Sequence, residues 1–186
     1  MQRDITHGTA PDRIPFMKRI SLPVLLPALL TGIDLGSKLL ARTLLVPGVH
    51  HLVVGNFFGF TLHQNNGIAF GLFAGLSQNI TIPLFVLISL AAIIYIIHFY
   101  RMLPRNKRLG RTALMLILGG ALGNLLDRLL TGKVTDFIDF AAFVPEYKNH
   151  WPVFNLGDVF IIAGVVILFL LLLTDREFGK KKPEGS

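Results

Sequence analysis

The side chains of this chain that are best suited to chemistry are carboxylates. The sequence has no cysteine, and the adjacent His50 and His51 lack the spacing of a zinc motif. Two carboxylates that lie close together share one proton, so one can activate a water while the other donates to a substrate carbonyl. The acidic residues between the start of the first apolar segment and the end of the last are Asp34, Asp127, Asp136, Asp139, Glu146 and Asp158.

Polar residues recur with helical spacing near the end of one apolar segment. Gly120, Asn124 and Asp127 follow a helical stripe, and Asn124 and Arg128 are four residues apart. Charged groups beside hydrocarbon are costly and usually mark function or a specific pairing. An interfacial ion pair or anchor is the simpler explanation of Asp127 and Arg128.

Two further polar pairs have helical spacing. Asn155 and Asp158 are three residues apart at the start of an apolar segment, and Asp34 and Lys38 are four apart in another. An acid at a helix N-terminus is favoured by the helix dipole, and Asp34 with Lys38 fits an ordinary helix ion pair. By pattern alone, Asp136 and Asp158 are equally consistent with catalysis and with such roles.

These residues are positioned by apolar segments long enough to cross a membrane. The sequence is 52% hydrophobic, with a mean hydropathy of +0.60, and the apolar residues are clustered. A spanning helix needs about 20 apolar residues. We therefore predict one membrane domain, residues 1–186, with polar tails at about 1–17 and 176–186. The predicted spans are about 20–40, 80–100, 112–130 and 154–174.

The distribution of basic residues predicts the orientation. The net charge of +7 arises mainly from Lys and Arg beside apolar segments, so we favour membrane headgroups over nucleic acid as partners. The basic residues gather before the first span, between the second and third, and after the last. Both termini are therefore predicted to be cytoplasmic. The opposite side holds only Arg42, Lys133 and Lys148 outside the spans.

The two connections on the outer side contain strand-like sequence. Residues 50–62 are rich in β-branched and aromatic residues with glycine breaks, and residues 134–140 alternate apolar with polar residues. The expected fold is thus an all-α membrane protein with four transmembrane helices, plus a small β-sheet layer and lid on the outer face.

Five sequence blocks, in order, resemble the lipoprotein signal peptidases, or signal peptidase II. No single block is decisive, but five in one order on one topology are specific. The blocks are Asp34-x-x-x-Lys38, Gln64 to Phe70, Gly119 to Arg128, Val134 to Phe137, and Phe154 to Asp158. Gly157 departs from the family pattern, which usually has alanine there.

The resemblance implies a metal-free aspartic peptidase of the bacterial cytoplasmic (inner) membrane, without a cofactor and monomeric in its working form. Such enzymes cleave diacylglyceryl-modified prolipoproteins before the lipidated cysteine, and globomycin inhibits them. The catalytic pair maps onto Asp136 and Asp158, on the outer side, and Asp139 is a weaker alternative to Asp136. The residues expected to bind substrate or support the pair are Asn65, Asn124, Arg128, Asn155 and Gly120, with Asp34, Lys38 and Asp127 as structural support.

Two other functions remain open from the residues alone. Intramembrane Asp and Arg also mark ion pathways in carriers, but here the acids gather at one boundary instead of crossing the membrane. No paired repeats of the carrier type occur. A non-enzymatic assembly factor would retain its function when the aspartates are replaced.

Overall fold

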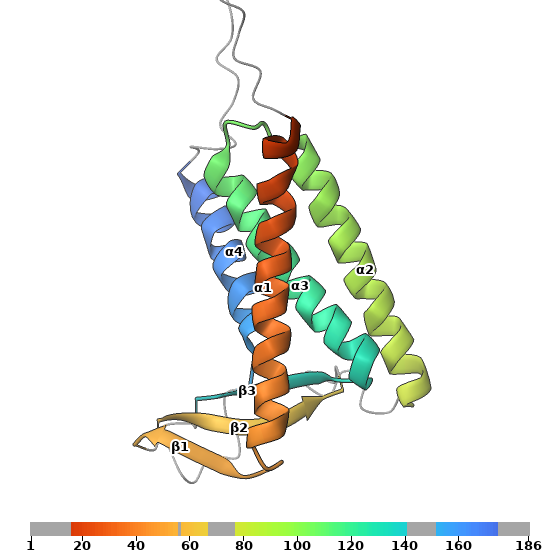
Figure 1. Ribbon diagram of the computed structural model, residues 1–186, viewed down its shortest axis with the longest axis vertical. Coiled ribbons are helices and arrows are strands. Elements are labelled where there is room, and N and C mark those ends of the chain that lie inside the picture. The colour runs from red at the N-terminus through yellow and green to blue at the C-terminus, as the bar shows by residue number, and fades with distance from the viewer. Residues whose placement is uncertain (1–15, 56, 67–76, 141–151, 175–186) are drawn as a thin grey trace, which may run out of the picture.

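The computed structural model describes residues 16–55, 57–66, 77–140 and 152–174 (Figure 1). The helices are α1 (Phe16–Leu44), α2 (Gln78–Met102), α3 (Arg108–Thr131) and α4 (Leu156–Leu173), and the strands are β1 (His50–Val54), β2 (Phe58–Asn65) and β3 (Val134–Asp139). Among the described residues, four helices are long and apolar enough to cross a membrane. The predicted class, four spans with a small sheet, is confirmed.

The helix ends differ from the predicted boundaries. Helix α1 continues to Leu44, beyond the predicted end at about residue 40, so Arg42 lies in its last turn instead of in a connection. A hydropathy scale ends the segment before Arg42 because it counts a guanidinium as polar. In the fold this guanidinium is paired with the buried Asp127 carboxylate. Helix α4 begins at Leu156, later than predicted, because Asn155 caps it and Phe154 pairs with Ile138. The predicted tails lie outside the described residues, except residues 16 and 17, which begin α1.

Helix α3 is the centre of the bundle and packs against α1, α2 and α4 (Figure 1). Small residues allow the backbones to approach, as is usual between membrane helices. A Cβ atom at Gly119 would collide with Leu30 of α1, and one at Gly120 would collide with the Gly157 carbonyl of α4. Gly120 therefore acts as a packing residue that brings α3 against the start of α4.

The three strands form an antiparallel sheet in the order β1-β2-β3, across one end of the helices (Figure 1). A buried cluster of Ala41, Leu62 and Phe137 joins the sheet to the end of α1. Phe154, just before α4, pairs with Ile138 and continues the sheet beyond β3. The sheet is thus fixed to both α1 and α4, and β3 passes close to the first turn of α4.

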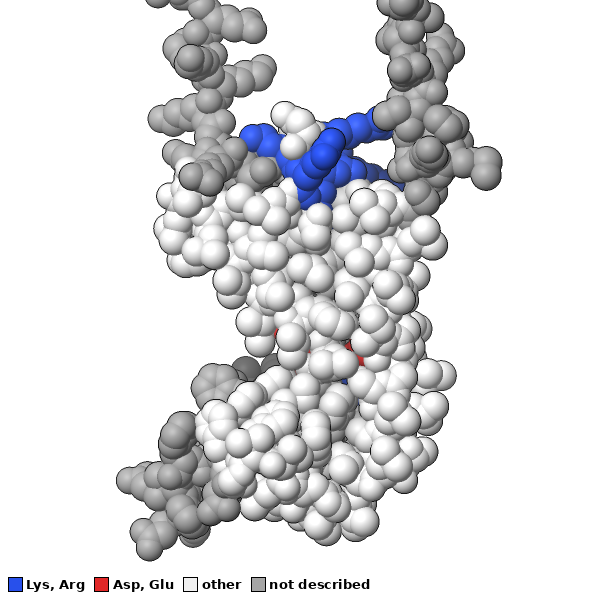
Figure 2. All heavy atoms as spheres, turned by 60° about the vertical axis from the view of Figure 1, so that its left-hand side comes forward, with Lys and Arg blue, Asp and Glu red and all other residues white. Residues whose placement is uncertain are grey.

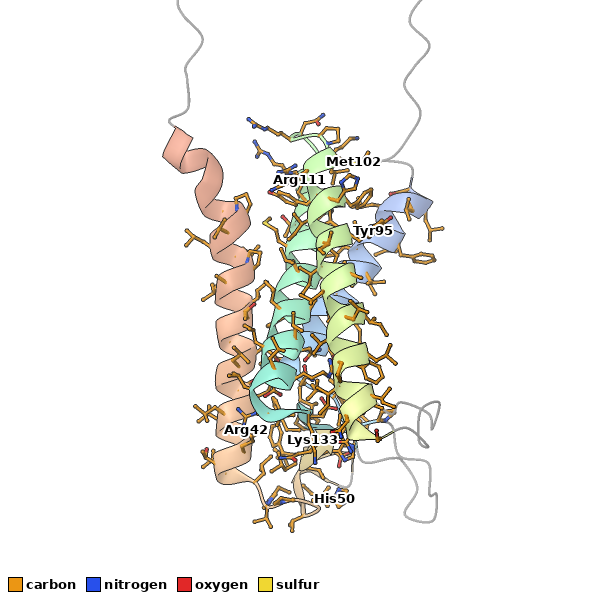
Figure 3. All side chains as sticks on the ribbon, turned by 90° about the vertical axis from the view of Figure 1, so that its right-hand side faces the viewer. Arg42, His50, Tyr95, Met102, Arg111 and Lys133 are labelled. Atoms are coloured by element: carbon orange, nitrogen blue, oxygen red, sulfur yellow. The ribbon has the colours of Figure 1, made fainter. Side chains whose placement is uncertain are left out.

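The two ends of the molecule differ in charge. Figure 2 shows Lys and Arg side chains gathered at the end of the helices opposite the sheet, with small patches of acidic side chains only where the surface narrows. Figure 3 places Arg111 and Met102 at the basic end, and Arg42, Lys133 and His50 at the sheet end. This asymmetry matches the charge pattern on which the predicted orientation depends.

Candidate active site

Strand β3 places Asp136 in a buried amide environment. Its side chain is 2% exposed. The Asn155 Nδ2 donates to Asp136 Oδ1 at 2.6 Å, and the Asn65 Nδ2 donates to Asp136 Oδ2 at 3.0 Å. Each carboxyl oxygen therefore has an amide donor, which fixes the orientation of the group.

Asp158 lies in the first turn of α4, where it closes a capping box with Asn155. The Asn155 backbone N–H donates to Asp158 Oδ2 at 3.1 Å, and the Asn124 Nδ2 donates to Asp158 Oδ1 at 2.9 Å. A capping box satisfies helix N–H groups that would otherwise lack partners. Local helix chemistry thus holds Asp158 at a defined position beside α3.

One fully buried side chain, Asn155, connects the two aspartates. Its Nδ2 donates to Asp136, while its Oδ1 accepts from the Asp158 backbone N–H at 3.0 Å. The opposite amide orientation would set an oxygen against the Asp136 carboxyl, so this network assigns the amide orientation. Asn155 therefore holds together two acids that are far apart in the sequence.

A second layer consists of the ion pair between Asp34 and Lys38, both 0% exposed. The Lys38 Nζ donates at 2.6 Å to Asp34 Oδ2 and at 2.6 Å to Asn124 Oδ1. Asp34 Oδ1 accepts from the Gly157 backbone N–H at 2.7 Å. The sequence predicted only the pair within α1. In the fold the pair also orients Asn124 and anchors the start of α4.

Asp127 fixes the start of β3, and the sequence analysis missed its partner, Arg42. The Arg42 Nη1 donates to Asp127 Oδ1 at 2.6 Å and to Thr135 Oγ1 at 2.8 Å, and the Thr135 backbone N–H donates to Asp127 Oδ2 at 2.7 Å. The available signal was the spacing of four residues from Lys38, which puts both cations on one side of α1. These bonds hold the residue that precedes Asp136.

The other predicted residues lie further out. The Arg128 guanidinium is 5.3 Å from the centre of the Phe85 ring, and both Asp136 and Asp158 attract it electrostatically. Asp139 does not join the pair, because its carboxyl binds Thr61 and His50 instead. Within the described parts of the chain, no group of three or more His, Cys, Asp or Glu side chains could hold a metal ion.

Burial raises the pKa of Asp136 to about 6, and the negative charge of Asp158 adds to this effect. The amide donors of Asn155 and Asn65 oppose it, because they stabilise the ionised form. A carboxyl with a raised pKa, beside a second carboxyl, can hold a proton near neutral pH. The arrangement is suited to acid–base activation of a water.

The raised pKa of Asp136 predicts that stability depends on pH. Between about pH 4 and 6 the folded protein binds more protons at this carboxyl than the unfolded chain does. The free energy of unfolding should therefore fall as the pH rises through this range, by an amount on the order of 3 kcal/mol, and then level off. Unfolding of detergent-solubilised protein, measured from pH 4 to 7, should show this fall. The fall should be absent in Asp136→Asn, and identical profiles for the two proteins would contradict the assignment.

Comparisons with known proteins identify the family. The family model for signal peptidase (SPase) II matches residues 26–174. A lipoprotein signal peptidase of Moorella thermoacetica is 44% identical over 162 residues, which cover 86% of this chain and 99% of that protein. A lipoprotein signal peptidase of Francisella tularensis subsp. mediasiatica is 39% identical over 158 residues, which cover 85% and 92%.

A solved bacterial membrane enzyme has the same fold. It superimposes with a TM-score of 0.71 at 31% identity, over 84% of this chain and 95% of that one. The family match, the relatives and the four spanning helices agree with one another. This chain therefore belongs to the signal peptidase II family, the lipoprotein signal peptidases, and is a multi-pass membrane peptidase.

Proposed function

We propose that this protein cleaves diacylglyceryl-modified prolipoproteins just before the lipidated cysteine, and that Asp136 and Asp158 activate the attacking water. The observation that carries this proposal is the position of Asn155, which bonds to Asp136 through its side chain and to Asp158 in a capping box. A pair held in this way shares one proton. The ionised carboxyl removes a proton from water, and the protonated one donates to the scissile carbonyl.

The substrate reaches this pair from the bilayer. The signal helix and the diacylglyceryl chains stay in hydrocarbon, where each buried CH₂ contributes about 0.8 kcal/mol. The scissile segment unwinds near the sheet, where polar groups replace its helical hydrogen bonds. Asn65, Asn124, Arg128 and Asn155 surround that region and supply the donors. The sheet end faces outward and both termini face the cytoplasm, in the inner membrane of a bacterium. Globomycin would inhibit the enzyme by competing with the substrate beside Asp136 and Asp158.

Cleavage should depend on the lipid. With purified enzyme in detergent, we expect a precursor that carries the diacylglyceryl group to be cut before its cysteine, and the same precursor without the lipid to be cut at least about 100-fold more slowly. The lost acyl contacts are worth far more than the 1.4 kcal/mol that corresponds to a tenfold change. Mass spectrometry of the products gives both the rate and the bond that is cut.

Equal cleavage of the two precursors, or a cut elsewhere in the chain, would overturn the proposed substrate. A monomer is expected to be active, so the rate per molecule should not change with enzyme concentration. Both the comparison of the two precursors and this concentration series use the unmodified enzyme, so they do not depend on which residues are catalytic.

A further inference from the structure

The connection between α2 and α3 carries a group of basic side chains that the proposed chemistry does not use. The group consists of Arg101, Arg105, Lys107 and Arg108, which we call the basic cluster. The three arginines are exposed, and Lys107 is half-buried. Residues 35–126, which include α2 and most of α3, contain no Asp or Glu. Figure 2 shows Lys and Arg side chains gathered at this end of the helices, so the cluster forms part of a surface with a strong positive charge.

The backbone that carries the basic cluster is held in a defined shape. The Lys107 N–H donates to the Pro104 carbonyl at 3.1 Å and closes the turn between the helices. The Arg111 Nη1 donates to the carbonyl oxygens of Tyr100 at 3.0 Å and Leu103 at 2.7 Å, and the guanidinium carbon lies 3.8 Å from the centre of the Tyr100 ring. Arg111 thus joins the start of α3 to the end of α2. A turn that is ordered in advance loses less entropy when it binds a ligand.

The basic cluster lies at the boundary of the bilayer, next to apolar surface. The spanning segments on either side of the turn end at Met102 and begin again at Arg108. Ile94, Tyr95 and Met102 are each 67% exposed, and their spacing of seven and eight residues places them on one side of α2. Figure 3 shows Tyr95 and Met102 on α2 at this end of the molecule. A ligand of the cluster therefore meets cations at one end and an apolar helix surface at the other.

These features fit a negatively charged phospholipid. Arginine donates paired hydrogen bonds to phosphate oxygens, and basic pockets at the ends of spanning helices bind the headgroups of such lipids. A free phosphate would contact the cations alone, whereas a phospholipid also places its acyl chains against Ile94 and Tyr95. One phosphodiester balances only one of the positive charges of the basic cluster. A lipid with two phosphates is therefore the better match.

We propose that the basic cluster binds diphosphatidylglycerol, with the two phosphates among its cations and the acyl chains along the exposed side of α2. Phosphatidylglycerol offers one phosphate only, and phosphatidylethanolamine adds an ammonium group that the cluster repels. Retention should therefore be greatest for diphosphatidylglycerol and smallest for phosphatidylethanolamine. The site is separate from Asp136 and Asp158, which lie near the sheet at the other end of the helices.

Native mass spectrometry of the full-length protein in detergent, with lipids of identical acyl chains in competition, tests this proposal. A basic side chain at an anionic lipid surface contributes about 1 kcal/mol, which corresponds to a factor of about five. With a factor of about five for each phosphate, diphosphatidylglycerol should be retained at least about 25-fold more than phosphatidylethanolamine. Against phosphatidylglycerol, at equal phosphate concentration, the expected factor is about five.

Variants of the basic cluster separate the effect of charge from that of the hydrocarbon. Arg105→Gln should lower the ratio of diphosphatidylglycerol to phosphatidylethanolamine about fivefold, and the double variant with Arg108→Gln should lower it about 25-fold. The matched control is Lys133→Gln, which removes one charge at the sheet end and should leave the ratio unchanged. These substitutions do not alter the exposed side of α2. An unchanged ratio in the double variant would therefore assign the preference to the acyl chains and overturn the proposal.

The same measurement distinguishes failure of this proposal from failure of the proposed function. Asp158→Asn, which is expected to lack cleavage, should keep the full lipid preference, and the double variant should cleave at the unmodified rate. Equal retention of all three lipids by the unmodified protein would overturn the proposal. So would displacement of the lipid by millimolar inorganic phosphate at constant ionic strength, because the basic cluster would then bind free anions.

Discussion

Asp158→Asn is expected to abolish cleavage of a lipidated precursor while leaving the protein folded. Asparagine keeps the size of aspartate and an oxygen that can accept from the Asn155 backbone N–H, so the capping box at the start of α4 survives. The group that takes or holds the proton is lost. Positioned acid–base groups contribute about 10²–10⁴ in rate, and at least this loss should appear in single-turnover assays. Asp136→Asn should lose a similar factor, since the two carboxyls act as one unit.

The matched control is Arg105→Gln, which also removes one charge but lies exposed at the opposite end of the helices. It should cleave at the unmodified rate. Gel-filtration profiles should agree among all three variants, and the unfolding midpoints of Asp158→Asn and Arg105→Gln should agree with each other. Normal turnover by either aspartate variant, with lipid supplied, would remove that residue from the chemistry. An assembly factor that is not an enzyme would show this result for both.

The second large effect is expected for Lys38→Met. The Asp34 carboxyl would keep the Gly157 N–H but lose the positive charge of Lys38, in a position that is 0% exposed. Removal of one member of a buried ion pair costs about 3–5 kcal/mol, because the other charge is left uncompensated. Asn124 would also lose the donor to its Oδ1, so its Nδ2 would no longer be held toward Asp158. We expect a further loss in rate of about 10–100-fold, comparable to that for supporting partners in metal sites.

Stability and rate separate in the double variant Asp34→Asn with Lys38→Met. The neutral amide removes the uncompensated charge and can still accept from Gly157, so urea unfolding should show most of the lost stability restored. The rate should remain low, because Asn124 still lacks its donor. A Lys38→Met protein with unchanged stability and unchanged cleavage would show that the ion pair neither supports the fold nor orients Asn124.

The sequence predicted the elements well, and the reason is physical. Apolar length and basic flanks determine where a chain can cross a bilayer, so the four spans were predictable, and so were the strands in the connections between them. The helix ends were less so. Arg42 was assigned to a loop because hydropathy records the cost of a guanidinium but not the buried carboxylate that offsets it.

The site could be predicted only in part. Residue type and family resemblance selected Asp136, Asp158, Asn155 and Asn124, and the fold brings them into one hydrogen-bonded network. Long-range partners left no local signal. The contact of Lys38 with Asn124 spans 86 positions in the sequence, and helical spacing within α1 could not predict it.

The central claim is that Asp136 and Asp158 act together on one water at the scissile bond. The most direct test is a crystal structure of the enzyme with a lipidated precursor peptide whose scissile amide is replaced by a hydroxyethylene group, which stands in for the hydrated carbonyl. We expect the hydroxyl to lie within about 3 Å of a carboxyl oxygen of each aspartate, the distance of a hydrogen bond. A hydroxyl bound beside Asp139, or in reach of only one member of the pair, would contradict it.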